Sequence, residues 1–302
     1  MSRLRIATRG SRLALVQARL VADALRAAHP DLEVKLVEVS TEGDRDRATP
    51  LSVLGGRGVF VKAVEDALLD GRADVAVHSL KDVPTEDVPG LVIAAVPERA
   101  DPRDALVTSG GRRLADLPAG ARVGTSSRRR AALLRALRPD LVAAEIRGNV
   151  DTRLARVAEG AYDGAILAAA GLDRLGRLDE ATQLFDALEF VPAPGQGALG
   201  VECRADDAAS RALVAALDDA GAHAATDAER GFLEALGAGC TLPVGAYATV
   251  DGDLVTLRGM LAADDDAVPH FADATGPASE AAAIGRSLAR QLQSELASAG
   301  AP

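Results

Sequence analysis

The sequence contains few aromatic residues and little cysteine. Only 2% of its 302 residues are aromatic and none is Trp, which argues against the aromatic stacking surfaces used by many nucleic-acid-binding proteins. The two cysteines, Cys203 and Cys240, are too few for a disulfide scaffold in a chain of this length. Hydrophobic residues make up 48% of the chain, so Ala, Leu and Val must fill substantial cores.

Long apolar runs and several common motifs are also missing. No run reaches the roughly 18 apolar residues that span a membrane, and residues 1–7 are typical of a strand and not of a signal peptide. We therefore expect a soluble cytoplasmic protein with no membrane partner. The sequence has no dinucleotide-binding, Walker or G-x-S-x-G motif. Its four histidines lack metal-ligand spacing, so we expect no metal site.

The net charge of the chain and the local distribution of its positive charge point to different properties. A net charge of -10 argues against a nucleic-acid partner. The positive charge is nearly all arginine and is concentrated in a few loops. Because the guanidinium fork matches carboxylate and phosphate groups, these loops are candidates for binding an anionic ligand.

Hydrophobic spacing predicts an α/β pattern that starts twice. Helices are expected at residues 12–28, 59–69, 128–137, 150–158, 207–220, 224–236 and 278–297. Strands are expected at 4–8, 33–39, 73–78, 91–96, 122–124, 141–146, 162–168, 244–250, 253–261 and 267–273. A charged, proline-containing segment at 97–103 is a candidate hinge, and the Gly/Pro-rich segment 192–200 is a second crossing. The long Gly-rich loop 41–58 is of a kind that is usually functional or mobile.

The two halves share a weak internal similarity. Residues 69–77 parallel residues 158–166, and each segment joins a helix to a strand. The turn at 8–11 likewise parallels the turn at 125–128. These matches favour a structural repeat, although α/β units in general resemble one another.

The two turns that precede helices carry serine and arginine. Ser11 and Ser127 are placed to cap helix N-termini, which by itself is an ordinary structural role. Arginines at a helix start oppose the helix dipole unless an anion balances them. Arg128, Arg129 and Arg130 therefore favour an anion site at the second turn.

Strand exits supply further candidates. Ligands of open α/β sheets bind at the carboxyl ends of the strands, where Arg147, Arg153 and Arg174 are expected. Asp82 follows a buried strand and is either a catalytic carboxylate or a plain turn residue before Val-Pro.

The cysteines differ in their surroundings. Cys203 fits a packed strand and is interpreted as a core thiol. Cys240 lies between Gly239 and a short loop ending at Pro243, and such glycines let a bulky group approach the backbone. It is either a reactive or modified thiol or an ordinary loop residue.

Taken together, these residues resemble the porphobilinogen deaminase family nearly from end to end. No single motif decides this, but eight occur in order. They are R-I-A-T-R-G-S (5–11), G-G-R-G-V-F-V-K (55–62), D-V-A-V-H-S-L-K-D-V-P (74–84), V-G-T-S-S-R-R-R (123–130), I-R-G-N-V-D-T-R-L (146–154), A-A-G-L-D-R-L-G (169–176), P-G-Q-G-A-L-G-V-E-C-R (194–204) and G-A-G-C-T-L-P-V-G (237–245).

The resemblance implies an α/β fold with two periplasmic-binding-protein-like lobes and a third small α/β domain with a three-stranded sheet. It places a discontinuous first lobe at 1–97 and 198–217. The second lobe would be 98–197, and the C-terminal domain, which anchors the cofactor, 218–302.

The resemblance also implies a transferase that condenses four porphobilinogen molecules on a dipyrromethane cofactor attached to Cys240. Asp82 matches the catalytic carboxylate. Residues implied to bind the cofactor are Lys81, Asp82, Thr125, Ser126, Ser127, Arg129, Arg130, Arg147 and Gly148. Residues implied to bind the substrate are Arg9, Ser11, Arg147, Arg153, Arg174 and Gln196. Arg57 and Phe60 would lie on a mobile loop beside the site, where many family members have Lys in place of Arg57.

Two other functions remain open at this point. A two-lobed anion-binding protein or sensor would explain the arginines but not Cys240. A thiol-dependent transferase would use Cys240 as a nucleophile and would be inactivated by thiol reagents. The family resemblance further implies a monomer, for which the sequence offers no test.

Overall fold

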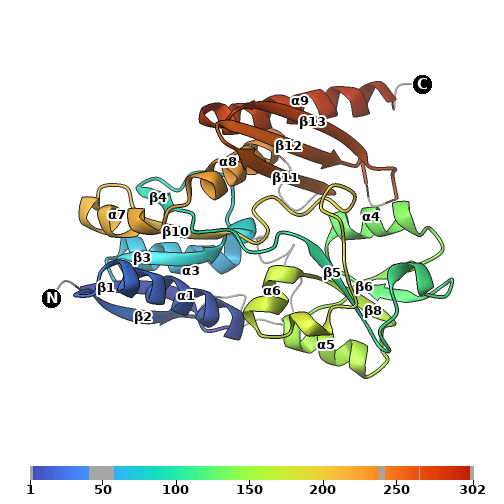
Figure 1. Ribbon diagram of the computed structural model, residues 1–302, viewed down its shortest axis with the longest axis horizontal. Coiled ribbons are helices and arrows are strands. Elements are labelled where there is room, and N and C mark those ends of the chain that lie inside the picture. Colours follow the sequence, from blue (N-terminus) through green and yellow to red (C-terminus); the bar gives the residue numbers. More distant parts are fainter. Residues whose placement is uncertain (1–2, 41–57, 238–241, 265, 300–302) are drawn as a thin grey trace. The chain divides into compact units, whose positions relative to one another are not determined.

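The computed structural model describes residues 3–40, 58–237, 242–264 and 266–299. These residues form a mixed α/β structure with two five-stranded sheets and one three-stranded sheet (Figure 1). The expected fold class, two sheet-based lobes with a smaller third sheet, is confirmed. No helix in the described ranges combines the length and the apolar character needed to cross a membrane.

Two compact units account for the chain. Unit 1 comprises Met1–Ala100 and Ala198–Thr226, and unit 2 comprises Asp101–Gly197 and Asp227–Pro302. The chain therefore passes from one unit to the other at three places. The division into three domains with the boundaries expected from the sequence stays a prediction.

Unit 1 is built on a sheet in the order β2-β1-β3-β10-β4. Strands β1, β2 and β3 are parallel, and β10 runs antiparallel to both β3 and β4. Helices α1 and α7 pack on one face, around Leu25 and Val214, and α3 packs on the other, around Leu68. Its elements are β1 (Arg3–Arg9), α1 (Arg12–Ala28), β2 (Glu33–Val39), α3 (Gly58–Leu69), β3 (Val75–Ser79), η1 (Leu80–Asp82), β4 (Leu91–Ala95), β10 (Leu199–Arg204), α7 (Ala208–Val214) and η4 (Ala215–Leu217).

The first part of unit 2 repeats this arrangement. Its sheet has the order β7-β6-β8-β5-β9, in which β6, β7 and β8 are parallel and β5 is antiparallel to β8. Its elements are β5 (Asp104–Thr108), η2 (Leu114–Asp116), β6 (Arg122–Gly124), α4 (Arg128–Leu137), β7 (Val142–Ala144), α5 (Val150–Ala158), β8 (Gly164–Ala168), α6 (Ala169–Arg174), η3 (Leu178–Glu180) and β9 (Gln183–Leu184).

The structural repeat expected from the sequence is confirmed. Helix α3 ends at Leu69 and β3 begins at Val75, while α5 ends at Ala158 and β8 begins at Gly164. The spacing is the same in both halves, and each element lies at the corresponding position of its sheet. The weak sequence similarity therefore marks one supersecondary unit used twice.

An aspartate before the third strand fixes the register in both copies. The backbone N–H of Arg5 donates to Asp74 at 2.8 Å, and the N–H of Asp74 donates to the Arg5 carbonyl at 2.9 Å. Arg122 and Asp163 exchange the same two bonds at 2.7 and 2.9 Å. Such a reciprocal pair satisfies backbone N–H and C=O groups that would otherwise lack a hydrogen-bond partner next to the strand ends.

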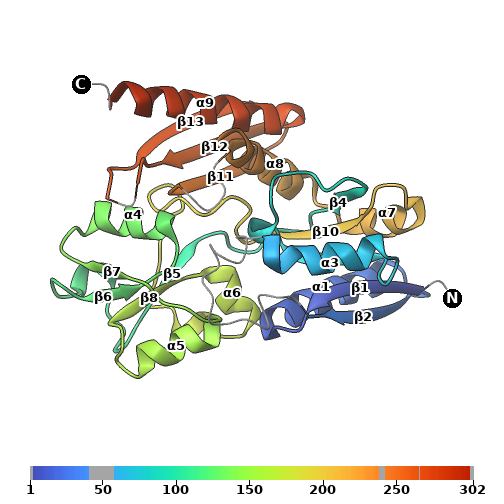
Figure 2. The ribbon, with the colours of Figure 1, turned by 180° about the vertical axis from the view of Figure 1, so that it is seen from behind.

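The rest of unit 2 is the C-terminal layer, drawn at the top of Figure 2. The antiparallel sheet β11-β12-β13 is covered on one face by α8 and α9. Its elements are α8 (Ala220–Ala235), which begins in unit 1, β11 (Val244–Asp251), β12 (Leu254–Leu261), β13 (His270–Pro277), η5 (Ala278–Glu280) and α9 (Ala281–Ala299).

Several boundaries differ from those expected. The third C-terminal strand runs from His270 to Pro277 instead of 267–273. The helix expected at 207–220 stops at Val214, and α8 begins at Ala220. The sequence reading missed β5, whose first residue is charged, because a charged residue at a strand end conceals an otherwise apolar run.

Helices α8 and α9 touch backbone to backbone. A Cβ on Gly285 would lie 2.0 Å from the carbonyl oxygen of Ala228, and one on Gly231 would lie 2.3 Å from that of Ala282. Neither carbonyl can move without breaking its helix. Both glycines are therefore required by close approach, which fixes how the two helices cover the sheet.

We predict that Gly285→Ala lowers the free energy of unfolding by about 1–3 kcal/mol, because the added methyl overpacks a backbone contact. Chemical denaturation measures this directly. Ser287→Ala, at an exposed position of the same helix, is the control and should stay within about 0.5 kcal/mol of wild type. Equal stabilities for the two variants would contradict the assigned contact.

Candidate functional site

In unit 1, Arg9 and Ser11 lie at the junction between β1 and α1. Ser11 is the N-cap of α1, as expected, and its side chain accepts the N–H of Ala14 at 3.3 Å. Because β1 and β3 are parallel neighbours, their carboxyl ends meet at one sheet edge. Arg9 and the residues that follow β3 therefore come from the same edge of unit 1.

Lys81 and Asp82 form a short turn directly after β3. Leu80 and Val83, on either side, are buried, and the N–H of Leu80 donates to the carbonyl of Ala198 at 3.1 Å. The N–H of Val83 closes the turn on the Leu80 carbonyl at 3.1 Å. Asp82 itself is exposed. The turn thus presents a carboxylate to solvent from a rigid, buried base.

The sequence reading missed two residues that support this edge. Gln17 of α1 is buried, and its Nε2 donates to the Oγ of Ser79 at 2.8 Å. Ser79 ends β3 and immediately precedes the turn. The bond therefore fixes α1 to the base of the Asp82 turn. A partner 62 residues away leaves no local signal in one sequence.

A second buried polar pair lies deeper in unit 1. His78 Nε2 and Glu202 Oε2 are 3.1 Å apart, and both side chains are buried between β3 and β10. Glu65 of α3 faces this pair. Burial of the Glu65 carboxyl and, to a smaller extent, the charge of Glu202 raise the pKa of Glu65 above its usual value.

In unit 2, Thr125, Ser126 and Ser127 form the loop between β6 and α4. Ser127 is the N-cap of α4, as expected, and accepts the N–H of Arg130 at 3.4 Å. Thr125 is buried and its Oγ1 accepts the N–H of Ser127 at 3.1 Å. Thr125 and Ser127 therefore shape the loop, whereas the Ser126 side chain is exposed.

Arg129 and Arg130 converge on one carboxylate. Asp104, at the start of β5, is 0% exposed. It accepts from Arg129 Nη1 at 2.7 Å and from Arg130 Nε and Nη2 at 3.0 and 2.7 Å. Burial alone would raise the pKa of Asp104, but the two guanidinium groups outweigh it and hold that pKa well below its usual range.

Asp104 is thus an important residue that the sequence reading missed. The signal available for it was a buried run, Ala105–Val107, that opens on a charged residue. Arg130 also donates to the Ile166 carbonyl at 3.0 Å, and Arg129 to the Val191 carbonyl at 2.6 Å. Direct binding of cofactor by these two side chains stays a prediction.

Arg153 lies beside the same loop, where it donates to two uncharged oxygen atoms. Its Nη2 donates to Ser126 Oγ at 3.1 Å and its Nε to the Gly148 carbonyl at 2.9 Å. Both acceptors are neutral. Burial, together with the nearby charge of Arg130, lowers the pKa of Arg153 to about 10. A neighbouring anion would relieve this cost.

Gly148 is required in this position. Its φ is +108°, and a Cβ would lie 2.7 Å from the side chain of Thr152. Arg147 precedes Gly148 in this turn. Its side chain is exposed and pairs with Glu145 at 2.8 Å.

Arg174 hydrogen-bonds to the residue that follows Gln196 in the chain, and Gln196 itself hydrogen-bonds to Asp104. Arg174 Nη2 donates to the carbonyl of Gly197 at 2.7 Å, and burial lowers the pKa of Arg174. Gln196 is 0% exposed, and its amide donates to Asp104 Oδ1 at 2.9 Å. Direct contact of Gln196 with substrate stays a prediction.

The remaining residues predicted from the sequence are Arg57, Phe60 and Cys240. Arg57 and Cys240 lie outside the described residues. The backbone of Phe60 lies in the first turn of α3. Cys203 is buried in the core of unit 1, where burial raises its thiol pKa, so the prediction of a core thiol is confirmed.

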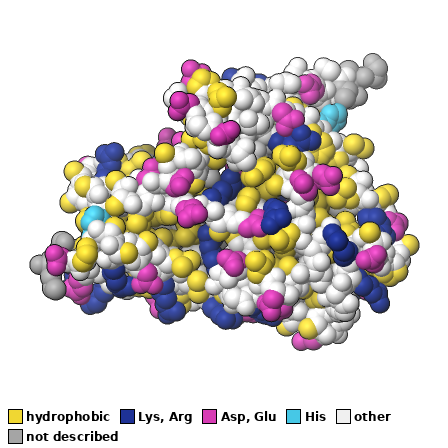
Figure 3. All heavy atoms as spheres, viewed as in Figure 1, with side chains coloured by type: hydrophobic (Ala, Val, Ile, Leu, Met, Phe, Trp, Pro, Cys, Tyr) yellow, Lys and Arg dark blue, Asp and Glu magenta, His cyan; other side chains and the backbone are white. Residues whose placement is uncertain are grey.

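The charge on the surface is mixed in sign. On the face shown in Figure 3, acidic and basic side chains are interspersed. Two cations of unit 2 stand out because burial lowers their pKa values: Arg153 in α5 and Arg174 at the end of α6. Within the described ranges no group of three or more His, Cys, Asp or Glu is suited to hold a metal ion.

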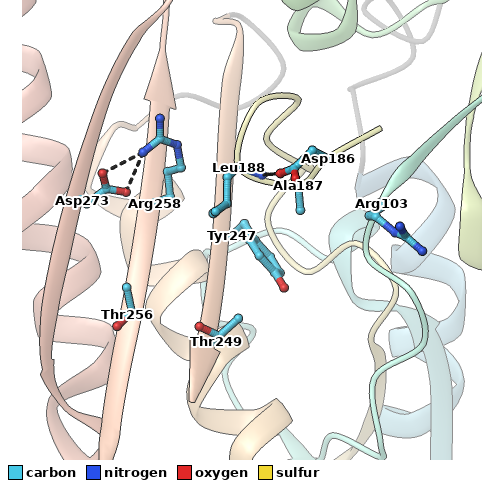
Figure 4. A pocket seen from close by; sticks show the side chains of 9 residues that line it. All are labelled: Arg103, Asp186, Ala187, Leu188, Tyr247, Thr249, Thr256, Arg258 and Asp273. Carbon is cyan, nitrogen blue, oxygen red and sulfur yellow. Dashed lines mark hydrogen bonds and ion pairs between the residues drawn. The ribbon is translucent and has the colours of Figure 1, made fainter. Parts of the chain in front are cut away.

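A separate cavity of about 420 Å³ lies in unit 2 between the open face of the C-terminal sheet and the 186–188 loop. Figure 4 shows Arg258 paired with Asp273, at 2.7 and 3.0 Å. Arg103, on the other side, pairs with Asp101 at 2.7 Å. Both cations are already neutralised, so this cavity gives no preference for an anionic ligand.

Two family models match the chain. The model described as "Porphobilinogen deaminase, dipyromethane cofactor binding domain" covers residues 4–212, and "Porphobilinogen deaminase, C-terminal domain" covers residues 224–294. The chain belongs to the porphobilinogen deaminase family.

Curated members of this family are similar over nearly their whole length. The porphobilinogen deaminase of Roseiflexus castenholzii is 50% identical over 289 residues, which cover 96% of this chain and 95% of that protein. The porphobilinogen deaminase of Xanthomonas axonopodis pv. citri is 50% identical over 292 residues, with 97% and 96% covered. The resemblance expected from the sequence is confirmed.

Solved structures resemble the chain more remotely. The methionine binding protein MetQ aligns with a TM-score of 0.46 at 12% identity, covering 70% of this chain and 88% of that one. The substrate binding domain of a putative molybdenum ABC transporter from Clostridium difficile aligns with a TM-score of 0.44 at 14% identity, with 70% and 90% covered.

Membership of the porphobilinogen deaminase family places the chain among transferases and gives it a cofactor-binding domain. That domain includes the Asp82 turn, the α4 start and Arg153, because all lie within residues 4–212. The two lobes described above therefore carry the family's dipyrromethane-binding region.

We predict that Asp104→Asn destabilises the porphobilinogen deaminase fold by about 3–5 kcal/mol, because it leaves two buried guanidinium groups without their counter-ion. Denaturant titration of purified protein measures the change. Asp140→Asn is the control, since Asp140 pairs with Arg138 at 2.6 Å on the surface and should matter little. A similar loss in both variants would show that Asp104 has no special structural role.

Proposed function

We propose that this chain is a hydroxymethylbilane synthase. It condenses four porphobilinogen molecules, one at a time and with loss of ammonia, on a covalently held dipyrromethane primer. Water then releases the linear tetrapyrrole. What supports this proposal is found in each unit separately: in unit 1 the Asp82 carboxylate is exposed on a turn with buried flanks, and in unit 2 burial lowers the pKa of Arg153 and of Arg174, which suits both to an anionic ligand.

The arginines fit a ligand rich in carboxylates. Each pyrrole of the substrate and of the primer carries an acetate and a propionate, so a growing chain accumulates negative charge. Arg153 and Arg174 have pKa values lowered by burial, and a carboxylate beside them would restore those pKa values and gain charge-assisted hydrogen bonds. Ser126 and the outward-facing Arg147 line the same unit 2 loops. The residues present thus suit the cofactor that the family model names.

Several residues would hold the primer and the substrate. We assign the primer to Lys81, Asp82, Thr125, Ser126, Ser127, Arg129, Arg130, Arg147 and Gly148. We assign the incoming substrate to Arg9, Ser11, Arg147, Arg153, Arg174 and Gln196. When bound, the primer supplies the free α-carbon to which new units add.

Asp82 carries the repeated chemistry in this proposal. Loss of ammonia from porphobilinogen leaves a positively charged pyrrole, which a fixed carboxylate stabilises. The buried flanks of the Asp82 turn hold that carboxylate without reorganisation. The positive charge disappears when the new carbon–carbon bond forms and the α-carbon gives up its proton.

Cys240 is assigned as the anchor of the primer through a thioether. Gly239 and Gly237 precede it in the sequence, which suits a thiol that must carry a bulky group. Arg57 is assigned to a loop beside the site, and Phe60 to the first turn of α3, which follows that loop. As a thioether, Cys240 takes no part in turnover and resists thiol reagents.

The chain is further proposed to act as a monomer in the cytoplasm, without a nucleic-acid partner. A net charge of -10 and a 2% aromatic content support the last point. Light scattering of the purified enzyme would give the mass of one chain, whereas a mass of two chains would overturn the monomer.

Intact mass spectrometry tests the anchor. We predict a mass excess equal to two linked pyrrole units in the wild-type protein and none in Cys240→Ser. Cys203→Ala is the matched control, because Cys203 is a buried core thiol, and it should keep the excess. A folded wild-type protein without the excess would rule out the covalent primer.

Turnover of porphobilinogen tests Asp82. We predict that Asp82→Ala keeps the fold and loses at least about 10²-fold in kcat, because a preorganised charge at the reacting centre is removed. Asp87→Ala removes an exposed acid from the same stretch of chain and should leave turnover unchanged. A rate for Asp82→Ala within a few-fold of wild type would remove Asp82 from the central role.

A further inference from the structure

Glu145 and Arg147 lie on one side of the short segment that joins β7 to α5 in unit 2. Both side chains are exposed, whereas Ile146 between them is 0% exposed and packs in a core cluster with Tyr162. This alternation is that of an extended segment, in which every second side chain shares a face. The proposed function assigns Arg147 to the primer and the substrate, and it gives Glu145 no role.

The backbone beneath this pair is held on both sides. The hydroxyl of Tyr162, a buried residue, donates to the carbonyl of Glu145 at 2.7 Å. Asn149 caps α5 by accepting the N–H of Thr152 at 2.9 Å, and the core packing of Ile146 fixes the residue between the pair. The two exposed side chains therefore extend from a backbone whose position is set.

One hydrogen bond joins the two side chains. Arg147 Nε donates to Glu145 Oε1 at 2.8 Å. In the part of the chain that the structure describes, neither Nη atom of Arg147 forms a hydrogen bond. The far edge of the guanidinium therefore keeps two N–H groups that can bind one carboxylate in the bidentate manner.

The pair differs from a surface ion pair that occupies its arginine fully. Asp140 accepts from both Nε and Nη2 of Arg138, at 2.7 and 2.6 Å, and Arg138 Nη1 donates to the carbonyl of Leu114 at 2.6 Å. All three nitrogen atoms of Arg138 are thus in use. Glu145 takes only one nitrogen atom of Arg147, so a ligand carboxylate can bind Arg147 without displacing it.

A second arginine assigned to the substrate lies beside this one. Arg153 Nε donates to the carbonyl of Gly148, the residue that follows Arg147. Binding of one carboxylate by both cations requires Arg147 to keep a defined direction. A side chain with many rotamers must be ordered when a ligand binds, and that ordering lowers affinity. An arginine already held at Nε loses less freedom on binding.

We propose that Glu145 is a positioning residue, which holds Arg147 by Nε so that its two Nη atoms are presented to a carboxylate of the substrate. The proposal rests on the proposed function, because that function supplies the carboxylate. Glu145 acts through Arg147 and touches no reacting atom. Its removal should therefore weaken substrate binding and leave the chemical step unchanged.

Steady-state kinetics of the loaded enzyme with porphobilinogen tests this role. In Glu145→Ala, KM should rise roughly two- to five-fold, the range that an exposed ion pair supports. The kcat should stay within about two-fold of wild type, because only binding common to ground state and transition state is lost. An unchanged KM would overturn the proposal. A lower KM would also overturn it, because Glu145 would then be a competitor of the substrate for Arg147.

Glu145→Gln tests the hydrogen bond itself. The amide keeps an oxygen atom that can accept the N–H of Arg147 Nε, although it lacks the charge. Its KM should therefore lie closer to that of wild type than to that of Glu145→Ala. Equal KM values in the two variants would contradict positioning through Nε.

A double-mutant cycle tests whether Glu145 acts through Arg147. In an Arg147→Ala background, Glu145→Ala should change KM no further, because the side chain that Glu145 holds is already absent. If Glu145→Ala raises KM by the same factor in both backgrounds, its effect does not pass through Arg147 and the proposal fails.

Asp140→Ala is the matched control. Asp140 is also an exposed acid of unit 2 that pairs with an arginine two residues away, at 2.6 Å, but Arg138 is not assigned to a ligand. Its KM should equal that of wild type, and a rise as large as that in Glu145→Ala would overturn the proposal. Absence of turnover in the wild-type enzyme would instead refute the proposed function, so the two failures are distinguishable.

Discussion

One buried carboxylate organises much of unit 2. Asp104 lies at the start of β5 and neutralises two guanidinium groups that belong to the first turn of α4. Without it, two cations would be buried at a helix N-terminus, where the dipole also opposes them. Because Gln196 binds the same carboxylate, the interaction also fixes the segment that returns the chain to unit 1. The loop that presents Ser126 and Ser127 depends on this pair of ion pairs.

This neutralisation divides the arginines into two groups. Arg129 and Arg130 are paired with an internal carboxylate, whereas Arg153 and Arg174 have neutral acceptors and lowered pKa values. A polycarboxylate ligand would bring an anion to this second group and raise those lowered pKa values. In unit 1 Asp82 is exposed, and the proposed function assigns to it the stabilisation of a positively charged pyrrole.

Local features were predictable from the sequence, and long-range partners were not. The caps Ser11 and Ser127, the repeated helix–strand unit and the core position of Cys203 follow from spacing within a few residues. The pairing of Asp104 with Arg129, 25 residues away, and of Gln17 with Ser79, 62 residues away, leaves no periodic signal. Strand β5 was missed because its first residue, Asp104, is charged, and the arginines that neutralise it lie far along the chain.

The central claim is that the chain assembles a linear tetrapyrrole from porphobilinogen. The most direct test is to incubate the purified protein with porphobilinogen and to quantify ammonia and tetrapyrrole together. The account predicts one ammonia for each porphobilinogen consumed and one linear tetrapyrrole for every four. Binding of porphobilinogen without release of ammonia would contradict it and would leave only an anion-binding protein.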